Sequence, residues 1–420
     1  MTPEEVLRQE IPGATMPKGS VAPARRVPQA TRWVWVGLLG WCLIRPCLLW
    51  AQEAPAPETQ PAPSAAPAAD PSPLQDLQWN GHVAVSYNYN LNGPVNTFRV
   101  FDESARQMTL HQAEFWLEKP SSSPESPIGF GVDVVLGADA KKIHAAGLGS
   151  ADDAFDLTQA YITYKVPIGA GLDLKVGKFV TLHGAEVIRR PGNFQVSRSI
   201  LFGYAIPFTH TGLMATYPVT DRFIVTLGVV NGWDNVRDNN SGKSLHGMVT
   251  VQPLEDLTLT VGGTWGPEQT DTNGPKRSLI DVVVTYKPMA PMTLIVNFDY
   301  GVEANAVPDE TGAGKTARWY GAAGYVLYDL GTRWSVGLRG EFFIDQAGFR
   351  LGWTDPTTGL PARCDLWELT GTVRYKIVDR LWASLEYRHD FARHPVFDGG
   401  TDGLKKSQGT VLVELVYLLK

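Results

Sequence analysis

An alternation of side-chain types with a period of two runs through the chain from Trp79 almost to its last residue. In residues 79–90, apolar and aromatic side chains take every second position, and mostly polar or small side chains lie between them. The same alternation recurs in residues 128–137, 159–166, 334–342, 367–376, 381–390 and 410–419. Successive side chains of a β-strand point to opposite faces of the sheet, so this pattern predicts strands and an all-β fold.

The lengths of the connections distinguish a membrane barrel from a water-soluble sandwich, which periodicity alone cannot do. Short links occur near Pro167, Pro218, Pro253, Pro288, Asp329 and Asp379, with a Pro- and Ser-rich link at residues 120–127. Longer polar connections alternate with them, at residues 90–107, 138–155, 180–207, 232–244, 266–277, 302–317, 346–364 and 391–407. Bacterial outer-membrane barrels combine an even strand number with short periplasmic turns and long outer loops. We therefore predict a transmembrane antiparallel β-barrel of about sixteen strands.

Aromatic residues close to the short links support this prediction. Tyr and Trp suit a membrane interface because the ring can be dry while its polar edge is wet. Residues of these two types lie within about four positions of a short link at Trp116, Tyr164, Tyr217, Tyr286, Tyr328, Trp334, Tyr375 and Trp382. The last strand ends in a related way, with Tyr417 three residues before the C-terminus.

The N-terminal region has the layout of a secretory signal peptide. Arg25, Arg26 and Arg32 precede an apolar run from Trp33 to Trp50, and a small residue, Ala51, stands before a polar stretch. This order of basic, apolar and small residues predicts a cleaved signal peptide at residues 1–51. A retained membrane helix is the alternative, and the Arg-Pro pair at residues 45–46 disfavours it. The start codon is open between Met1 and Met16.

The segment that follows differs from both its neighbours. Residues 52–76 are rich in Pro and Ala and contain no aromatic side chain. Such a segment cannot bury enough apolar surface to fold, so we expect a disordered linker there. The barrel is then expected to occupy residues 77–420.

Charge and cysteine content exclude several classes of function. Residues 1–51 carry six basic and three acidic side chains, which leaves 31 basic and 40 acidic in the remainder, a net charge of −9. An acidic chain of this kind gives no indication of nucleic-acid binding. Cys364 is the one cysteine outside the predicted signal peptide. We therefore expect no disulfide, no metal site and no cofactor.

The sequence also gives no sign of catalysis. Ser384 and His389 could suggest a hydrolase, but they stand five positions apart on a predicted strand. An odd spacing places two side chains on opposite faces, so they cannot cooperate. We predict no catalytic residue and no enzymatic activity.

Four short motifs carry a resemblance to a known family. They are Lys175-Val-Gly-Lys-Phe179, Ser197-Arg-Ser-Ile-Leu-Phe202, Pro207-Phe-Thr-His-Thr-Gly212 and Val230-Asn-Gly-Trp-Asp234. The order of these motifs and their positions at strand ends are similar to those of the OmpL-like group of β-barrel porins. The resemblance covers residues 77–420. The resemblance implies an outer-membrane channel without a known cofactor, and it implies no specific substrate.

A barrel of this size is too wide for side chains to fill, so a water-filled lumen is expected. General sixteen-stranded porins fold the loop after the fifth strand into the lumen, and here that loop is 180–207. We hypothesise that it forms the pore constriction through Glu186, Arg189, Arg190 and Arg198. A surface-exposed loop with solvated charges is the alternative. Candidate wall residues at inward strand positions are Asp133, Lys175, Arg339, Glu341, Glu368, Arg374, Glu386 and Arg388.

These features together predict a porin of the bacterial outer membrane, a passive diffusion channel for small hydrophilic solutes or ions. Its partners would be the membrane lipid and those solutes. A homotrimer is an open expectation, because sixteen-stranded porins often form trimers. The alternative is a non-conducting surface-binding barrel, an adhesin or receptor, which a lumen plugged by the long loops would favour. Ion selectivity is open, since the loop arginines favour anions and the net charge favours cations.

Overall fold

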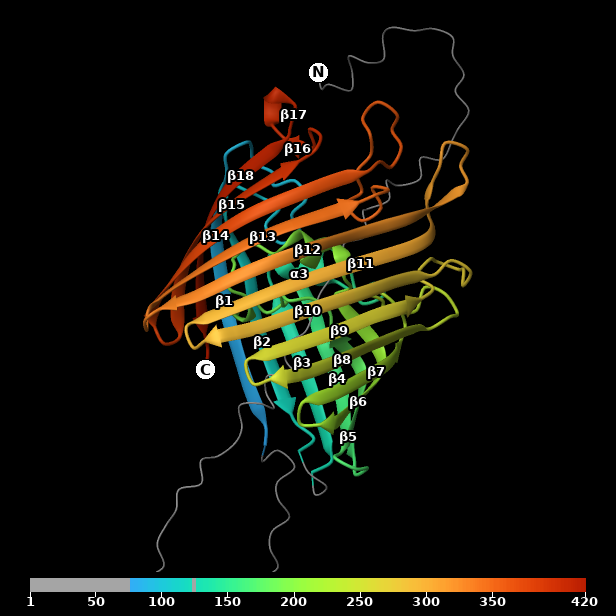
Figure 1. The fold of residues 1–420 in the computed structure, drawn as a ribbon, viewed down its shortest axis with the longest axis vertical. Coiled ribbons are helices and arrows are strands. Elements are labelled where there is room, and N and C mark those ends of the chain that lie inside the picture. Colours follow the sequence, from blue (N-terminus) through green and yellow to red (C-terminus); the bar gives the residue numbers. More distant parts are fainter. Residues whose placement is uncertain (1–75, 123–125) are drawn as a thin grey trace, which may run out of the picture.

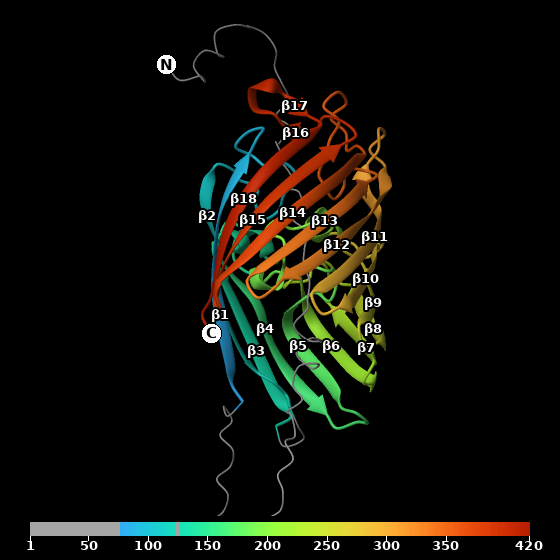
Figure 2. The ribbon, with the colours of Figure 1, turned by 60° about the vertical axis from the view of Figure 1, so that its left-hand side comes forward.

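A computed structural model describes residues 76–122 and 126–420. The predicted signal peptide (1–51) and all but the last residue of the predicted linker (52–76) lie outside the described residues. Sixteen antiparallel strands form a closed barrel in which each strand pairs with its neighbours along the chain (Figures 1 and 2). The barrel closes where the first strand pairs with the last, from His82 opposite Leu418 to Asn90 opposite Thr410. The predicted fold class and strand number are confirmed.

The barrel strands in chain order are β1 (Gln78–Asn90), β2 (Gln107–Lys119), β3 (Ile128–Leu136), β4 (Phe155–Val166), β5 (Leu172–Val180), β6 (Thr209–Thr220), β7 (Phe223–Val230), β8 (Ser244–Leu254), β9 (Leu257–Gly266), β10 (Arg277–Met289), β11 (Met292–Pro308), β12 (Gly314–Leu330), β13 (Trp334–Asp345), β14 (Cys364–Val378), β15 (Leu381–Ala392) and β18 (Ser407–Leu418). The short strands β16 (Phe397–Asp398) and β17 (Leu404–Lys405) pair within the last long loop. One short helix, α3 (Ala138–Ile143), lies in the second long loop.

The two faces of each strand separate by polarity, as the alternation predicts. Leu338 and Leu369 point outward and are 57% and 58% exposed, whereas Arg339 and Glu386 point inward and are fully buried. In a membrane the exposed apolar face contacts lipid, and the polar face lines the interior. The inward side chains are buried because the long loops fold over them.

The alternation of short and long links is confirmed, with one correction. The predicted long loop at 302–317 is instead a tight turn of residues 309–313, because β11 continues to Pro308 and β12 begins at Gly314. Val307 still pairs with Lys315 near this turn. Hydrogen-bonded strands can project beyond the membrane into water, where their polar residues carry no penalty, so polarity alone misplaced the strand ends.

The aromatic residues near the short links do not all form one belt. Trp334 and Tyr375 face outward, with ring centroids 4.5 Å apart. Trp116 and Trp382 face the interior instead, where Arg189 and Arg374 lie over their rings at 5.2 and 5.3 Å. Sequence distance from a turn does not tell on which face a side chain lies, so the prediction was wrong for these two tryptophans.

The long loops share an apolar core inside the outer mouth of the barrel. Phe101, Ile143, Phe208, Trp233 and Phe397 come from five different connections and belong to one buried cluster. Figure 1 shows α3 within the ring of strands, at the level of these loops. None of the helices in residues 76–122 and 126–420 is long and apolar enough to cross a membrane.

Candidate pore constriction

The connection between β5 and β6, residues 181–208, folds into the barrel and is called the inner loop below. It includes a 3-10 turn, Arg190–Gly192, and a short π-helix, Leu201–Ala205. Its backbone and side chains bond to β2, β3, β12, β13, β14, β15 and β18. A loop with partners on so many strands lies inside the barrel and is fixed to several parts of its wall.

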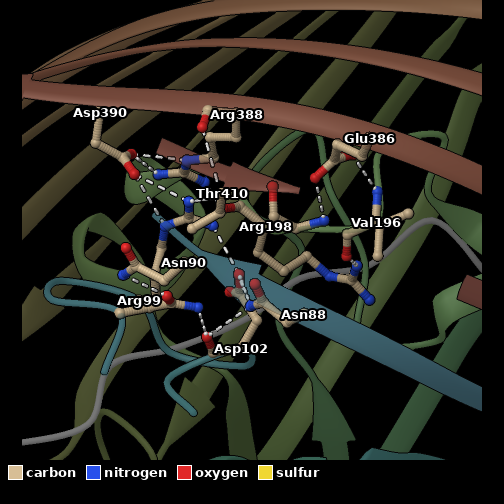
Figure 3. Close-up of polar contacts among 12 residues, drawn as sticks. Asn88, Asn90, Arg99, Asp102, Val196, Arg198, Glu386, Arg388, Asp390 and Thr410 are labelled. Atoms are coloured by element: carbon tan, nitrogen blue, oxygen red, sulfur yellow. Dashed lines mark hydrogen bonds and ion pairs between the residues drawn. The ribbon is translucent and has the colours of Figure 1, made fainter. Parts of the chain in front are cut away.

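Two wall glutamates hold the inner loop by its backbone. The Glu386 carboxylate accepts hydrogen bonds from the amides of Val196 and Ser197 at 2.6 and 2.9 Å (Figure 3). Glu341 accepts bonds from the amides of Ile200 and Leu201 at 2.7 and 2.5 Å. Each of these two carboxyl groups accepts two backbone amides, so together they fix the position of residues 196–201 of the inner loop.

Wall arginines on β13 and β15 hold the same stretch of the loop. Arg339 contacts Glu186 at 2.7 Å and donates to the Ser197 carbonyl at 2.8 Å, while its Nε meets Glu368 at 2.6 Å. Arg388 donates to the Arg198 carbonyl at 2.5 Å. Removing one partner of a buried ion pair costs about 3–5 kcal/mol, so these arginines hold the loop firmly against β13 and β15.

Arg190 is neutralised by two carboxylates. Its guanidinium contacts Asp139 of α3 at 2.9 Å and Glu414 of β18 at 2.6 Å. Burial alone would raise the pKa of Asp139, but the nearby Arg190 and His111 lower it below its usual range. Burial likewise opposes the charge on Arg190, yet Asp139 and Glu414 raise its pKa above the ordinary value. Both groups are therefore charged at neutral pH, and their charges cancel locally.

Arg198 has a different environment. Its guanidinium lies 5.6 Å from the ring centres of Phe101 and Phe202 and donates to the Ile188 carbonyl at 3.1 Å. Burial and then the proximity of Arg190 lower its pKa to about 10, so it is still charged at neutral pH. Arg198 thus joins the first long loop to the inner loop through cation–π contacts.

A neighbouring network attaches the first long loop, residues 91–106, to the wall. Arg99 contacts Asp102 at 2.7 Å and Asp390 of β15 at 2.9 Å, and it donates to the Thr410 hydroxyl of β18 at 2.9 Å. Figure 3 shows these groups converging below β15, with Arg388 on the other side of Asp390. The first long loop and the inner loop are therefore both bonded to β15 and β18.

The first residues of the inner loop sit against the opposite wall. The ring of His183 lies 4.8 Å from that of His246, which lies 4.4 Å from that of His210. A Cβ atom on Gly262 would come within 2.7 Å of the His183 ring, so the ring fits only because Gly262 has no side chain. Burial and then His210 lower the pKa of His183 to about 3, so this ring is neutral at neutral pH.

The wall formed by β2–β5 is less completely covered. Trp116, Glu118, Tyr161 and Lys175 face the interior and are half-buried. Arg189 of the inner loop contacts Asp133 at 2.6 Å and pairs with Glu114, and its side chain is 20% exposed. A small cavity separates the loop from this wall, lined in part by Trp116, Gln159 and Tyr161.

The predicted site residues occupy the interior. Glu186, Arg189, Arg190 and Arg198 all lie on the inner loop within the barrel, and all but Arg189 are buried. The predicted wall residues face inward, and six of them contact the inner loop: Asp133, Arg339, Glu341, Arg374, Glu386 and Arg388. Glu368 contacts Arg339, and Lys175 lies 4.2 Å from the Tyr161 ring centre. Their role as a constriction stays a prediction.

Several partners of these residues were absent from the predicted set. Glu114 and Glu414 lie on inward strand positions, so the alternation could have identified them. Asp139 comes from α3, for which the sequence showed no strand pattern. Among the described residues, no group of three or more His, Cys, Asp or Glu side chains is arranged to hold a metal ion.

A family comparison identifies the fold and its class. The family model described as "Putative beta-barrel porin-2, OmpL-like" matches residues 76–419. The chain belongs to this porin family. The match confirms the resemblance that the four motifs indicated, and it places the porin in the bacterial outer membrane. The family and the fold are those of a channel.

Solved structures of other outer-membrane proteins share the fold. DcaP, an outer membrane channel of Acinetobacter baumannii, aligns with a TM-score of 0.56 at 12% identity, over 82% of this chain and 97% of that chain. An anion-selective porin from Comamonas acidovorans aligns with a TM-score of 0.54 at 11% identity, over 82% and 99%. OmpT of Vibrio cholerae in its trimer form gives 0.53 at 12%, over 81% and 98%. No curated protein matches the sequence.

Proposed function

We propose that this porin is a passive diffusion channel for small hydrophilic solutes or ions, in which the inner loop sets the width of the pore. The observation that carries the proposal is the anchoring of this loop to strands on several sides of a closed sixteen-stranded barrel. Width and charge at the narrowest point decide what passes through such a barrel.

The route of the solute is proposed to follow the β2–β5 wall. On the far side, Glu341, Glu386 and Arg388 bind the loop backbone directly and hold it against the wall. Near β2–β5, Arg189 and Trp116 are half-buried and border a small cavity. A modest shift of Arg189 would widen the lumen at this point, and no shift of the anchored backbone is needed.

A second candidate function is a surface-binding barrel that does not conduct. The apolar core shared by the long loops, which includes Phe101, Trp233 and Phe397, favours it because these side chains fill the outer mouth. The porin family and the charged lining of the interior favour the channel.

The proposal also includes the absence of enzymatic activity and a homotrimeric assembly. Ser384 is buried on the inward face, while His389 lies beside Tyr387 on the outward face, so the two do not form a catalytic pair. OmpT of Vibrio cholerae, which shares the fold, has a trimer form, and this supports the trimer as a proposal for our chain.

Single-channel recording in a planar lipid bilayer tests the proposed function. Refolded, purified protein should give conductance steps on the order of several hundred picosiemens if the lumen is open. The reversal potential in a salt gradient then reports ion preference. A correctly folded barrel that gives no conductance would contradict the channel and favour the surface-binding function.

A further inference from the structure

The outer wall of the barrel contains a groove that the channel function does not use. It holds about 360 Å³ and lies on the outward face of β11–β14. Figure 2 shows these four strands side by side in the wall. The outward side chains that line it are those of Val296, Ala322, Phe342 and Trp367, with Gly324 and Gly340 between them. Gly324 pairs directly with Gly340 across two strands, so bare backbone forms the floor.

No neighbouring side chain of the barrel covers the backbone at Gly324 and Gly340. A Cβ atom built on Gly324 would meet no atom within 4 Å, and one on Gly340 would meet only Leu369 at 3.9 Å. The groove is apolar and faces the hydrocarbon region of the membrane. A flexible chain of methylene groups would recover the van der Waals contacts that an unfilled groove lacks.

Aromatic rings flank the groove on the side of the long loops. Tyr300 pairs with Tyr320 across β11 and β12, two positions beyond Phe298 and Ala322, and their rings are stacked at 6.3 Å. Trp367 is stacked on Phe391 at 6.2 Å. Tyr and Trp favour the boundary between hydrocarbon and water, so the groove runs from the membrane interior toward the outer surface.

Arginines stand at the next level toward the long loops. Arg318 is exposed and outward-facing, because its neighbours Ala317 and Trp319 are buried on the inward face. Arg363 contacts Asp365 at 2.7 Å, and Arg393 lies 3.9 Å from the same carboxylate. The side chains of Arg363 and Arg393 are 48% and 64% exposed. Arg363 and Arg393 thus share the carboxylate of Asp365, and Arg318 lies two strands away on the same outward face.

We propose that this wall binds a phosphorylated glycolipid of the outer leaflet, of the lipid A type. One acyl chain would lie in the groove over Gly324 and Gly340, and the phosphates would lie among Arg318, Arg363 and Arg393. The positive charge selects an anionic head group, and the long-loop side of such a barrel faces the outer leaflet. The site does not depend on conduction through the lumen.

Native mass spectrometry of the purified protein with added lipid tests the site. Lipid A should bind with one molecule per chain, phosphatidylglycerol more weakly, and phosphatidylcholine not measurably. Arg318→Gln should weaken lipid A binding about five-fold, since one arginine near a membrane surface contributes about 1 kcal/mol. Gly324→Leu should abolish binding, because a Cβ atom at this position meets no atom within 4 Å and the rest of the side chain would occupy the groove.

Two matched variants serve as controls. Arg333→Gln removes an exposed arginine from the opposite rim, and Ala215→Leu enlarges an outward side chain of β6 on another part of the wall. Both should bind lipid A like the unaltered protein. Heat-modifiable migration in gels shows whether each variant has folded.

Three outcomes would overturn the proposal. Arg318→Gln and Gly324→Leu could bind lipid A as well as the unaltered protein does. Phosphatidylglycerol could bind as tightly as lipid A, which would mean a general anionic-lipid surface. Gly324→Leu could instead break up an oligomer that carries no lipid, which would assign the groove to a second copy of this chain.

Discussion

The two sides of the lumen differ in how the inner loop meets them. On β13–β15 the wall binds the loop backbone through Glu341, Glu386 and Arg388, which are almost fully buried. On β2, Gln112 binds the loop backbone at Ile188 and Arg190, but between these two residues the side chain of Arg189 contacts β2 and β3 and is partly exposed beside a small cavity. Backbone anchoring gives a rigid partition, whereas a side-chain contact can move by rotation. We infer a fixed wall at β13–β15 and an adjustable passage around the Arg189 side chain.

Deletion of the inner loop tests this comparison with the largest expected effect. Replacing residues 184–205 by a short glycine linker should raise single-channel conductance on the order of three-fold, because conduction depends on the narrowest cross-section. The measurement is conductance in a planar bilayer. An unchanged conductance would mean that the other long loops, and not this one, limit the pore.

Breaking an anchor on the closed side should have the next largest effect. Glu386→Ala leaves the amides of Val196 and Ser197 without their acceptor, and each such loss costs about 1–3 kcal/mol. We expect a lower urea midpoint and a noisier, larger current. Glu118→Ala on β2 is the matched control, and it should alter neither property to the same extent. Equal effects of the two variants would remove the distinction between the walls.

Arg189→Ala should change the ion preference of the adjustable side. Without this arginine, Glu114 and Asp133 lose their cation, so the passage becomes more acidic. The reversal potential should shift toward cation preference, while conductance changes by less than about two-fold. A shift toward anions would place the solute route elsewhere in the lumen.

The smallest effect concerns pH and the Arg190–Asp139 pair. The pKa of Asp139 lies below its ordinary value of about 3.9, so the stabilisation from its ionised form is present above that value. It is lost only as the pH falls through the lower, folded-state pKa. The difference in urea midpoint between the unaltered protein and Asp139→Asn should be constant from pH 7 to about 5 and shrink below about 4. A difference that already falls by pH 6 would contradict this assignment.

Much of the fold could be predicted because a membrane barrel requires a regular pattern of side-chain types and link lengths in the sequence. Strand faces such as that of Leu338 and Arg339 follow from a period of two, and strand number follows from the alternation of turns. The end of β11 at Pro308 and the inward direction of Trp116 could not be predicted. Both depend on how far a strand is paired and which face it turns inward, and local composition does not determine either.

The candidate site was predictable in part. The inner loop and the inward charges were identified from position and alternation, but their pairing was not. Arg190 contacts Glu414, which is 224 positions away in the sequence. It also contacts Asp139, which lies on a helix that the sequence pattern did not predict. Contacts at such separations depend on the closure of the barrel and on the path of the loop through it.

The sequence by itself determined that this chain is a sixteen-stranded barrel with one polar and one apolar face per strand. The physical reason is that lipid and an enclosed lumen impose opposite preferences on alternate residues. Only the tertiary structure decided that the loop arginines meet carboxylates or aromatic rings, that the loop backbone is bonded to β13–β15, and that glycines of β12 and β13 align into an outer groove. Those features depend on register and on long-range closure, which bring together residues that the sequence keeps apart.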